Sequence, residues 1–582
     1  MHRPTQGFAL ASALAVMVLV LLITFMLTSN SVSELMQTNS SQGLVRARAL
    51  AEASVAQVTG TLVNEGLKST NDVLKPYATA FSTSGKSADQ DPIIPEGSYS
   101  SVLTALNGMS GTTVSIVAPD NGGSSTGQLQ FTNMRVDEAS FSKAGQVYYV
   151  DYTIQGVGTS STFRRTVTTG GTMRLVLGRQ YLNQYVLLAD DGGSTSGGYF
   201  GTGSAFDGPV HFNKNLALAG TPVFQYGLTV ASPTTLMYNC SARTWQATAN
   251  QTNDCTQPGY GGYGQQHVTD SVPLPNNAYS QARAALGLDE NNATDALTNA
   301  EICQATGQTS SCVPTSGVYV PKKNGSVSGG IFIQGNAQDV RLSVNGSNQV
   351  YNITDAAGVV TRIEVSYTAK TTTVTSGSTS TTLQGVPNGQ LYANGSILSL
   401  QGPARTGTVP SPAPSNSVPT QVPPALAPDS QLNIASSGDM KIQGDLTYTN
   451  DPRQSPNAKN VLGLISGQGH VLIGRNAPND VYVMGSMLAG ASGKGLKVEG
   501  IDEGTVTFGN RGKIHLFGSL AESLDQLRGL ADGNFNLAKG YDDDFHYDKR
   551  FLNGGAVPPY FPATTKFTAN TFWPSQRTWE EQ

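Results

Sequence analysis

The chain has 582 residues, too many for a single hydrophobic core, so two or three domains are expected. Glycine occupies 65 positions and charged residues make up only 13% of the chain, which argues against a helical bundle and, with 8% aromatic residues, favours a mainly β protein. The formal net charge of −5 gives no overall attraction to nucleic acid or to anionic lipid.

An uncharged apolar stretch covers residues 8–27, close to the N-terminus. About 20 residues at 1.5 Å each give about 30 Å as a helix, which matches the hydrocarbon core of a bilayer. His2 and Arg3 precede this stretch, and the next basic residue is Arg46, so the positive-inside rule keeps the N-terminus cytoplasmic. The rest of the chain is therefore expected on the outer side of the membrane.

The helical pattern continues beyond the apolar stretch. From Leu44 to Leu62, small and apolar residues recur every three or four positions, and no proline follows the leader until Pro76. We therefore predict one helix over residues 8 to about 66, apolar on all sides in its first third and amphipathic afterwards. At 1.5 Å per residue, this helix is on the order of 90 Å long.

A short basic leader that ends in Gly7, followed by Phe8 and the long helix, resembles the N-terminus of type IV pilins and type II secretion pseudopilins. The resemblance implies that a prepilin peptidase cuts between Gly7 and Phe8 and that the new amine of Phe8 is methylated. It also implies a single-pass inner-membrane protein that assembles with other pilins through its N-terminal helix. General secretory cleavage near residues 29–31 is the alternative, but the helical pattern runs through that position.

The chain has Ser12 at the fifth mature position, where most members of this family carry Glu. In a filament, that Glu pairs with the positive N-terminus of the subunit ahead, and an unpaired carboxylate in an apolar bundle costs several kcal/mol. A subunit at the tip has no subunit ahead of it, so Ser12 favours a tip position. Drift in a subunit of low copy number is the alternative.

The four cysteines form two close pairs in sequence, Cys240 with Cys255 and Cys303 with Cys312. Because the outer compartment is oxidising, we expect two sequence-local disulfides. A zinc site is the rival interpretation, but the spacing contains no C-x-x-C element and only His267 lies near.

Composition and the pattern of apolar residues divide the chain into five parts. They are a leader (1–7), the membrane half of the helix (8–27), a pilin-like domain (28–180), a β-rich region (181–540) and a C-terminal tail (541–582). Within the pilin-like domain, residues 67–128 are predicted to be a loop-dominated connector. The antiparallel sheet that packs under the helix is predicted from four alternating runs, 129–134, 147–154, 163–168 and 173–177.

Short apolar triplets alternate with Gly and Asn throughout residues 181–540. Strands of three to five residues with glycine corners are typical of a β-solenoid, in which each rung buries its inward residues on its neighbours. No strict period survives, so we predict an irregular solenoid. An up-and-down sandwich is the alternative, but it requires longer and more evenly spaced strands. The predicted fold class is mainly β with one long N-terminal α-helix.

Three segments are predicted to interrupt the solenoid. Residues 238–312 hold both cysteine pairs and a short helix at 280–288, and the Thr/Ser run 367–383 is predicted to form a hairpin. Residues 403–428 are rich in Pro and Ser and are predicted to be an extended, solvated linker. The tail is predicted to cover a solenoid edge or to return to the pilin sheet.

The chain resembles, more narrowly, the large competence-associated ComZ-like minor pilins of the Deinococcus and Thermus lineage, in which a β-solenoid is grafted on a pilin domain. Three segments carry this besides the leader: 208–213, 272–275 and 329–335. The resemblance implies a solenoid at the pilus tip that contacts incoming DNA, and a role in natural transformation.

Catalysis has no positive support in the sequence. Glycan-cleaving β-helices need paired carboxylates on one face, and the dense acidic group, residues 542–548, lies in the predicted tail. Calcium could bind there, but the spaced loop of a dedicated site is missing, so a solvated turn is favoured. We therefore expect no enzyme, no metal and no cofactor.

Two functional classes remain open: a pilus-tip subunit that contacts DNA, and an adhesin or secretion pseudopilin that binds protein or glycan. The residues proposed for DNA contact are Tyr260, Tyr263, Lys322 and Lys323, because tyrosines can stack on bases and lysines can neutralise phosphates. The alternative is that the tyrosines pack the insertion and the lysines are ordinary solvated charges.

Overall fold

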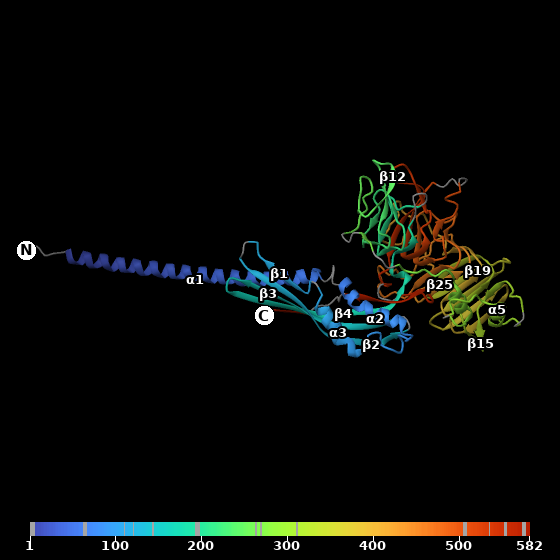
Figure 1. Ribbon diagram of the computed structural model, residues 1–582, viewed down its shortest axis with the longest axis horizontal. Helices are drawn as coiled ribbons and strands as arrows, with labels where there is room; N and C mark the ends of the chain where they lie inside the picture. Colours follow the sequence, from blue (N-terminus) through green and yellow to red (C-terminus); the bar gives the residue numbers. More distant parts are fainter. Residues whose placement is uncertain are drawn as a thin grey trace, which may run out of the picture. The chain divides into compact units, whose positions relative to one another are not determined.

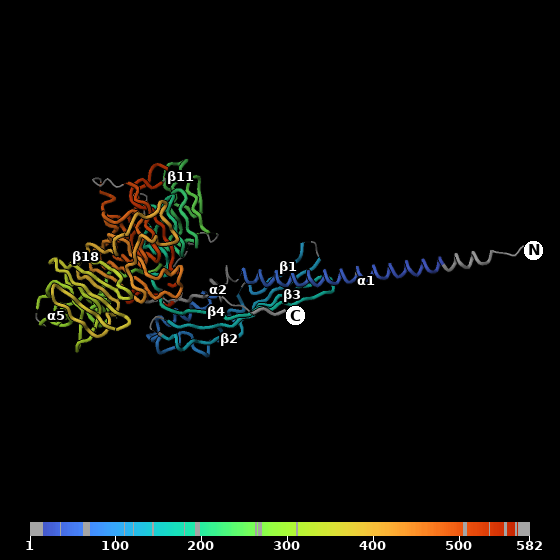
Figure 2. The backbone as a smooth tube through the Cα atoms, turned by 180° about the vertical axis from the view of Figure 1, so that it is seen from behind, coloured from blue at the N-terminus to red at the C-terminus, as the bar shows by residue number. Residues whose placement is uncertain are grey.

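The computed structural model describes residues 6–61, 67–109, 111–119, 122–142, 145–192, 198–261, 265–267, 271–290, 292–309, 312–503, 509–534, 536–551, 556–572 and 578–581, with only the backbone at the ends of some elements. The chain forms two compact units. The first comprises Met1–Gln180 and Thr565–Gln582, and the second comprises Tyr181–Thr564. Figure 1 labels their elements, and Figure 2 traces the backbone from behind.

The first unit combines one long helix with a six-stranded sheet (Figure 1). α1 (Gln6–Thr61) runs for 56 residues, and its C-terminal part packs on β2 and β3. The strands follow the order β1, β2, β3, β4, β34, with β35 also paired to β4, and β1 to β4 are antiparallel. Their bounds are β1 (Thr113–Val117), β2 (Ser124–Ser142), β3 (Gly145–Ser160), β4 (Phe163–Tyr181), β34 (Ala563–Phe572) and β35 (Thr578–Glu581).

The packing of α1 on the sheet follows from its side-chain spacing. Ala47, Ala51, Val55 and Val58 recur every three or four residues on one face of the helix, and all four are buried. Beneath them, a Cβ at Gly158 of β3 would collide with the carbonyl oxygen of Ala47. The glycine therefore allows the helix backbone to approach the strand closely. The mainly β fold class with one long N-terminal helix is confirmed.

Residues 67–128 are not the loop-dominated connector that the composition suggested. They contain α2 (Leu67–Thr83), the 3-10 helix η2 (Glu96–Ser98), α3 (Tyr99–Asn107), β1 and the start of β2. Leu74, Ala78 and Phe81 bury one face of α2 in the core of this unit. The composition misled because polar residues of the outer helix face outnumber these three, whereas their spacing of three to four residues is helical.

Two of the four predicted sheet runs, 163–168 and 173–177, belong to the single strand β4. The pair Gly170 and Gly171 between them is not a turn, and the register with β3 continues through both. Gly171 lies opposite Tyr152, where a Cβ would come within 2.9 Å of the tyrosine hydroxyl. Glycine here makes room for a buried ring rather than reversing the chain.

The second unit is built on two large sheets. In the larger sheet β13, β10, β7, β5, β31, β29, β27, β25, β23 and β17 are successive parallel neighbours, and β14 adds an antiparallel strand at the end. The bounds of these strands, in chain order, are β5 (Leu187–Asp191), β7 (Val210–Phe212), β10 (Leu228–Val230), β13 (Gln265–His267), β14 (Gly317–Tyr319), β17 (Ile331–Gln334), β23 (Gln390–Asn394), β25 (Gln431–Ser436), β27 (Val461–Ser466), β29 (Val481–Ala489) and β31 (Asn510–Leu524).

The second sheet combines parallel and antiparallel pairing. β18, β24, β26, β28 and β30 are parallel neighbours, and β19 to β22 extend β18 as an antiparallel meander. The bounds in this sheet are β15 (Lys322–Lys323), β16 (Ser326–Val327), β18 (Ala337–Asn345), β19 (Asn348–Asp355), β20 (Val360–Ser366), β21 (Thr371–Ser376), β22 (Thr379–Gln384), β24 (Ile397–Gln401), β26 (Met440–Ile442), β28 (Val471–Ile473) and β30 (Leu496–Val498).

Successive turns of the chain place one strand in each sheet, as β23 and β24 do, and then β25 and β26. The turns stack in register, so that Ile331, Leu391, Ile434 and Leu464 form one column of paired residues, all buried in the core. β31, near the end of the unit, pairs with β5, the first strand of the unit. Two strands separated by more than 300 residues of sequence thus lie side by side in the larger sheet.

Four more strands extend from β31, the strand that pairs with β5. β33 (Leu537–Tyr547) pairs in parallel with β31 and with β6 (Ala205–Asp207), β6 pairs with β9 (Val223–Phe224), and β32 (Gly529–Ala531) pairs with β33. The short η3 (Leu182–Gln184) precedes β5. The predicted tail therefore does not begin at residue 541, because residues 541–547 belong to β33.

The three interrupting segments differ in their structures. Residues 238–312 include the end of β11 (Thr235–Asn239), β12 (Thr244–Thr248), α4 (Tyr279–Leu286) and α5 (Asn299–Thr306); β11 also pairs with β8 (Ala217–Leu218). The Thr/Ser run forms the antiparallel hairpin of β21 and β22. Residues 403–428 are not a solvated linker, because Ala425, Leu426 and Ala427 are fully buried in the core. The prediction of a linker was wrong because it was based on the Pro and Ser content of the whole segment and overlooked this short apolar run.

Candidate functional site

The N-terminal half of α1 is the most exposed apolar surface in the described part of the chain. Its large apolar side chains from Val16 to Leu27 are 49% to 72% exposed. Among the described residues, α1 is the one helix long and apolar enough to cross a membrane. The predicted cleavage site at Gly7 and Phe8, and also Ser12, lie in the part of α1 whose side chains fall outside the described residues.

The cysteines pair as expected from their spacing: the sulfurs of Cys240 and Cys255 lie at disulfide-bonding distance, and so do those of Cys303 and Cys312. Their Cα atoms are 5.8 Å and 6.2 Å apart, which suits a disulfide. The first pair ties the turn between β11 and β12 to the segment that follows β12. The second ties α5 to the segment that follows it.

The structure does not bring the residues proposed for DNA contact together. The Tyr260 ring stacks on Phe224 at 6.1 Å, and its hydroxyl donates to Oε1 of Gln265 at 3.1 Å, beside β13. Lys322 and Lys323 are exposed on β15, which follows β14 at the opposite end of the larger sheet's strand order. Tyr263 lies outside the described residues. Tyr260 and the two lysines therefore do not lie beside one another in the described part of the chain.

Basic residues on the second sheet are largely matched by acidic neighbours. The ion pairs are Arg341 with Asp339 at 2.5 Å, Arg362 with Glu364 at 2.7 Å and Lys441 with Glu499 at 2.6 Å. These pairs leave little net positive charge along this sheet. Any attraction to phosphate at β15 rests on Lys322 and Lys323 themselves.

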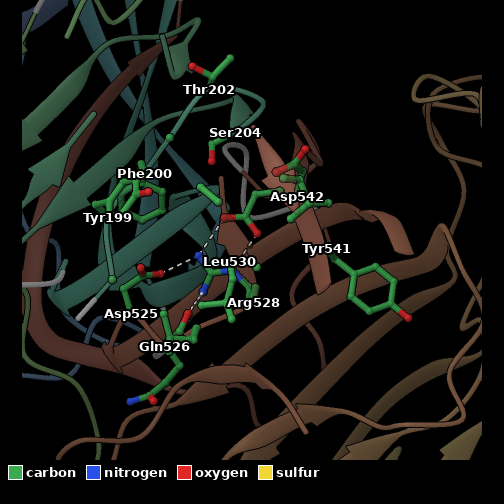
Figure 3. Close-up of a pocket in the computed structure, with 17 residues that line it drawn as sticks. Tyr199, Phe200, Thr202, Ser204, Asp525, Gln526, Arg528, Leu530, Tyr541 and Asp542 are labelled. Atoms are coloured by element: carbon green, nitrogen blue, oxygen red, sulfur yellow. Dashed lines mark hydrogen bonds and ion pairs between the residues drawn. The ribbon is translucent and has the colours of Figure 1, made fainter. Parts of the chain in front are cut away.

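A buried ionic cluster, missed from the sequence, surrounds Arg528 (Figure 3). The guanidinium makes a bidentate pair with Asp543 at 2.7 and 2.8 Å, reaches Asp525 at 2.6 Å and lies 3.5 Å from Glu522. All four side chains are at most 6% exposed. Burial raises the pKa of Glu522 well above its usual value, and burial also raises the pKa of Asp525. Three carboxylates thus share one buried positive charge.

A second buried network links histidines and carboxylates. His515 of β31 is 4% exposed, with Nδ1 2.6 Å from Oδ2 of Asp544 and Nε2 3.5 Å from Oδ1 of Asp480. Its ring stacks on Tyr482 at 4.4 Å, and the other oxygen of Asp544 lies 3.3 Å from Nε2 of His546. Burial alone would lower the pKa of His515, but hydrogen bonds to the two carboxylates raise it. His515 therefore favours its charged form.

The acidic run 542–548 is not the solvated turn that its composition suggested. Asp543 and Asp544 are 5% and 3% exposed, because β33 is a strand in the stack and both side chains have cationic partners. The spacing of the large apolar residues could have predicted a strand here. Tyr541, Phe545 and Tyr547 lie an even number of positions apart with Asp543 between them, and all four are buried, as on one face of a strand. Among the described residues, no group of three His, Cys, Asp or Glu side chains is arranged to hold a metal ion.

Comparisons with known proteins give limited matches. A family model described as a domain of unknown function, DUF4900, matches residues 147–240. No curated protein matches the chain. Among solved structures, the chain is similar to the crystal structure of the competence-associated pilin ComZ from Thermus thermophilus, with 11% identity, 93% of this chain and 98% of that chain covered, and a TM-score of 0.28. A TM-score this low does not establish a common fold.

Proposed function

We propose that the chain is a pilin-like subunit of a surface filament, anchored by α1 and carrying the second unit as its outer body. The observation that carries this proposal is the division of α1 into two halves. The half from Val16 to Leu27 is apolar and exposed, while Ala47, Ala51, Val55 and Val58 bury one face of the other half on the sheet of the same unit. An apolar helix of this length requires a membrane or other apolar helices around it.

The proposal includes processing and position. A prepilin peptidase would cut between Gly7 and Phe8 and methylate Phe8, and the mature helix would leave the inner membrane to assemble with other pilins. Ser12, in place of the usual Glu, supports a minor subunit at the tip. The stacked parallel turns of the second unit, with their apolar interior, support an irregular β-solenoid as the displayed body. We assign this body a binding role and no catalytic one.

The processing step is tested by mass spectrometry of the mature protein from the native host. The expected mass begins at Phe8 and carries one methyl group on its amine. A Gly7→Val variant should accumulate as the uncut precursor. A mature chain that begins near Val32 would contradict the proposal, because the membrane half of α1 would then be a discarded signal.

For the ligand, we propose DNA taken up in natural transformation, contacted by Lys322 and Lys323 on β15. Both side chains are exposed, and they form an adjacent pair at the end of the second sheet. Since each lost phosphate contact lowers the slope of log affinity against log salt by about one, replacing both by Ala should flatten it by about two. Lys459→Ala, at an exposed lysine paired with Asp429, is the control and should leave the slope unchanged.

The DNA titration uses the full chain in detergent and labelled DNA at several salt concentrations. Absence of wild-type binding at low salt would rule out DNA contact by this subunit and leave the filament proposal intact. A slope that stays unchanged in the double variant would move the contact away from β15.

A further inference from the structure

We propose that the second unit binds a glycan bearing free amino sugars, at a site formed by the β11–β12 hairpin and the cavity above Arg528. The site combines an aromatic cluster on the surface with an acidic cavity beside it, and Tyr199 belongs to both. The proposal is independent of how α1 assembles, so its failure would leave the filament role untouched.

The aromatic part is Trp245 of β12 with the two tyrosines that contact its ring, Tyr199 and Tyr238. Its ring lies 5.5 Å from Tyr199 and 5.6 Å from Tyr238, and it is partly exposed. The Cys240–Cys255 disulfide ties the turn of the hairpin that carries Trp245 and Tyr238 to the segment after β12. A partly exposed indole that packs against two other rings offers an apolar surface on which the C–H face of a sugar ring can stack. The same surface attracts an ammonium group.

The cavity has a volume of about 280 Å³ and is lined by Tyr199, Thr202, Ser204, Arg528 and Asp542, among others. This volume lies near the lower end of the range for small-molecule sites, about 300 Å³ and above, so it suits one sugar ring of a longer chain. Figure 3 shows Tyr199 on the left, Asp542 on the right and Arg528 between them, with its bonds to the neighbouring carboxylates dashed. The hydroxyl groups of Tyr199, Thr202 and Ser204 can donate or accept hydrogen bonds.

Asp542 is the carboxylate in this cavity that Arg528 does not pair with. Burial and the neighbouring Asp543 raise the pKa of Asp542 to about 6. Gly203, with φ +102°, faces it, and a Cβ at that position would come within 2.7 Å of its Oδ2. The glycine therefore leaves room for this carboxylate, which lines the cavity. A cationic group placed there would stabilise the ionised form of Asp542.

The charge of the lining selects among ligands. Asp525, Asp542 and Asp543 face the cavity together with a single cation, Arg528, so the cavity is net acidic. Phosphates of a nucleic acid and carboxylates of a uronic acid are repelled there, whereas the ammonium of an amino sugar is attracted. The site thus differs from the DNA contact proposed at β15 in both place and ligand.

The test is isothermal titration of the full chain in detergent with the tetramer of β-1,4-linked glucosamine at pH 7. The fully N-acetylated tetramer and tetragalacturonate are the comparison probes. We expect binding of the glucosamine tetramer, at least tenfold weaker binding of the N-acetylated tetramer, and none of the galacturonate. Trp245→Ala should weaken binding about tenfold, and Asp542→Asn about fivefold.

Two control variants separate the site from general surface effects. Tyr226→Ala removes an aromatic residue that is 42% exposed, and Glu503→Gln removes an exposed carboxylate. Both should bind like wild type, and every variant should keep the wild-type unfolding temperature. The proposal is overturned by no binding of the glucosamine tetramer at millimolar concentration, by equal binding of the N-acetylated tetramer, or by unchanged binding in both site variants.

Discussion

Replacing Arg528 by Met should destabilise the second unit and make its stability depend on pH with a defined sign. In the wild-type protein, the guanidinium pairs with Asp543 at 2.7 Å and Asp525 at 2.6 Å and lies 3.5 Å from Glu522, all inside the core. Arg528→Met leaves these three carboxylates buried without their cation. Removal of one partner from a buried pair costs about 3–5 kcal/mol, because the remaining charge is uncompensated.

The pH dependence follows from protonation of the stranded carboxylates. Their folded-state pKa values rise further when the cation is lost, so the folded variant binds more protons than its unfolded chain. Stability then increases as pH falls, by up to about 1.4 kcal/mol per pH unit for each proton taken up. We expect a loss of about 3–5 kcal/mol at pH 8 and a clearly smaller loss at pH 5.

The assay is urea unfolding of the full chain in detergent, followed by the fluorescence of Trp245. The other two tryptophans, which lie in the first unit, are replaced by Phe in every protein compared. Arg341→Met is the control. The Arg341 side chain is 60% exposed, so its ion pair with Asp339 should contribute less than about 1 kcal/mol to the free energy of unfolding. An equal loss at both pH values, or a loss as small as that of the control, would refute this account of the cluster.

Three further predictions concern other parts of the chain. Gly158→Ala should destabilise the first unit by about 1–3 kcal/mol through its collision with Ala47, whereas Gly60→Ala, in open space on α1, should be neutral or slightly stabilising; thermal unfolding compares them. The pKa of His515 is raised in the folded state, so its stabilisation is present below pH 6.5 and is lost as pH rises through the folded pKa; wild type and His515→Gln should therefore differ more at pH 5.5 than at pH 9. Titration of the denatured, unreduced protein should find no free thiol, and any reactive thiol would contradict the two disulfides.

Local patterns in the sequence predicted the features that depend on local spacing. The apolar stretch and the three-to-four-residue spacing of Ala47, Ala51 and Val55 predicted α1, because helix geometry is set within a few turns. The short strands of the second unit were also visible as apolar triplets between glycines. Pairs of cysteines close in sequence predicted their own partners, since short loops close easily in an oxidising compartment.

Long-range pairing could not be predicted in the same way. β5 lies between β31 and β7, although more than 300 residues separate it from β31 along the chain. Alternation of polar and apolar side chains says which face of a strand is buried, but it does not say which strand lies beside it. The same limit applies to Tyr260 and Lys322, which were proposed together for DNA contact. Tyr260 lies beside β13 at one end of the larger sheet's strand order, and Lys322 lies on β15 of the second sheet, which follows β14 at the other end.

The buried charges show why the acidic run was misjudged. Taken alone, three adjacent aspartates read as a solvated turn, because an isolated buried carboxylate is too costly. Asp543 can be buried only because β33 lies beside the segment that carries Arg528, and Asp544 only because His515 pairs with it from β31. The cost of burying these carboxylates is therefore offset by cationic partners from other parts of the chain. Local sequence patterns do not predict which residues those partners are. Asp542 lines the cavity and takes part in none of the ion pairs of the described residues, which is why it is the residue on which selection of a cationic ligand rests.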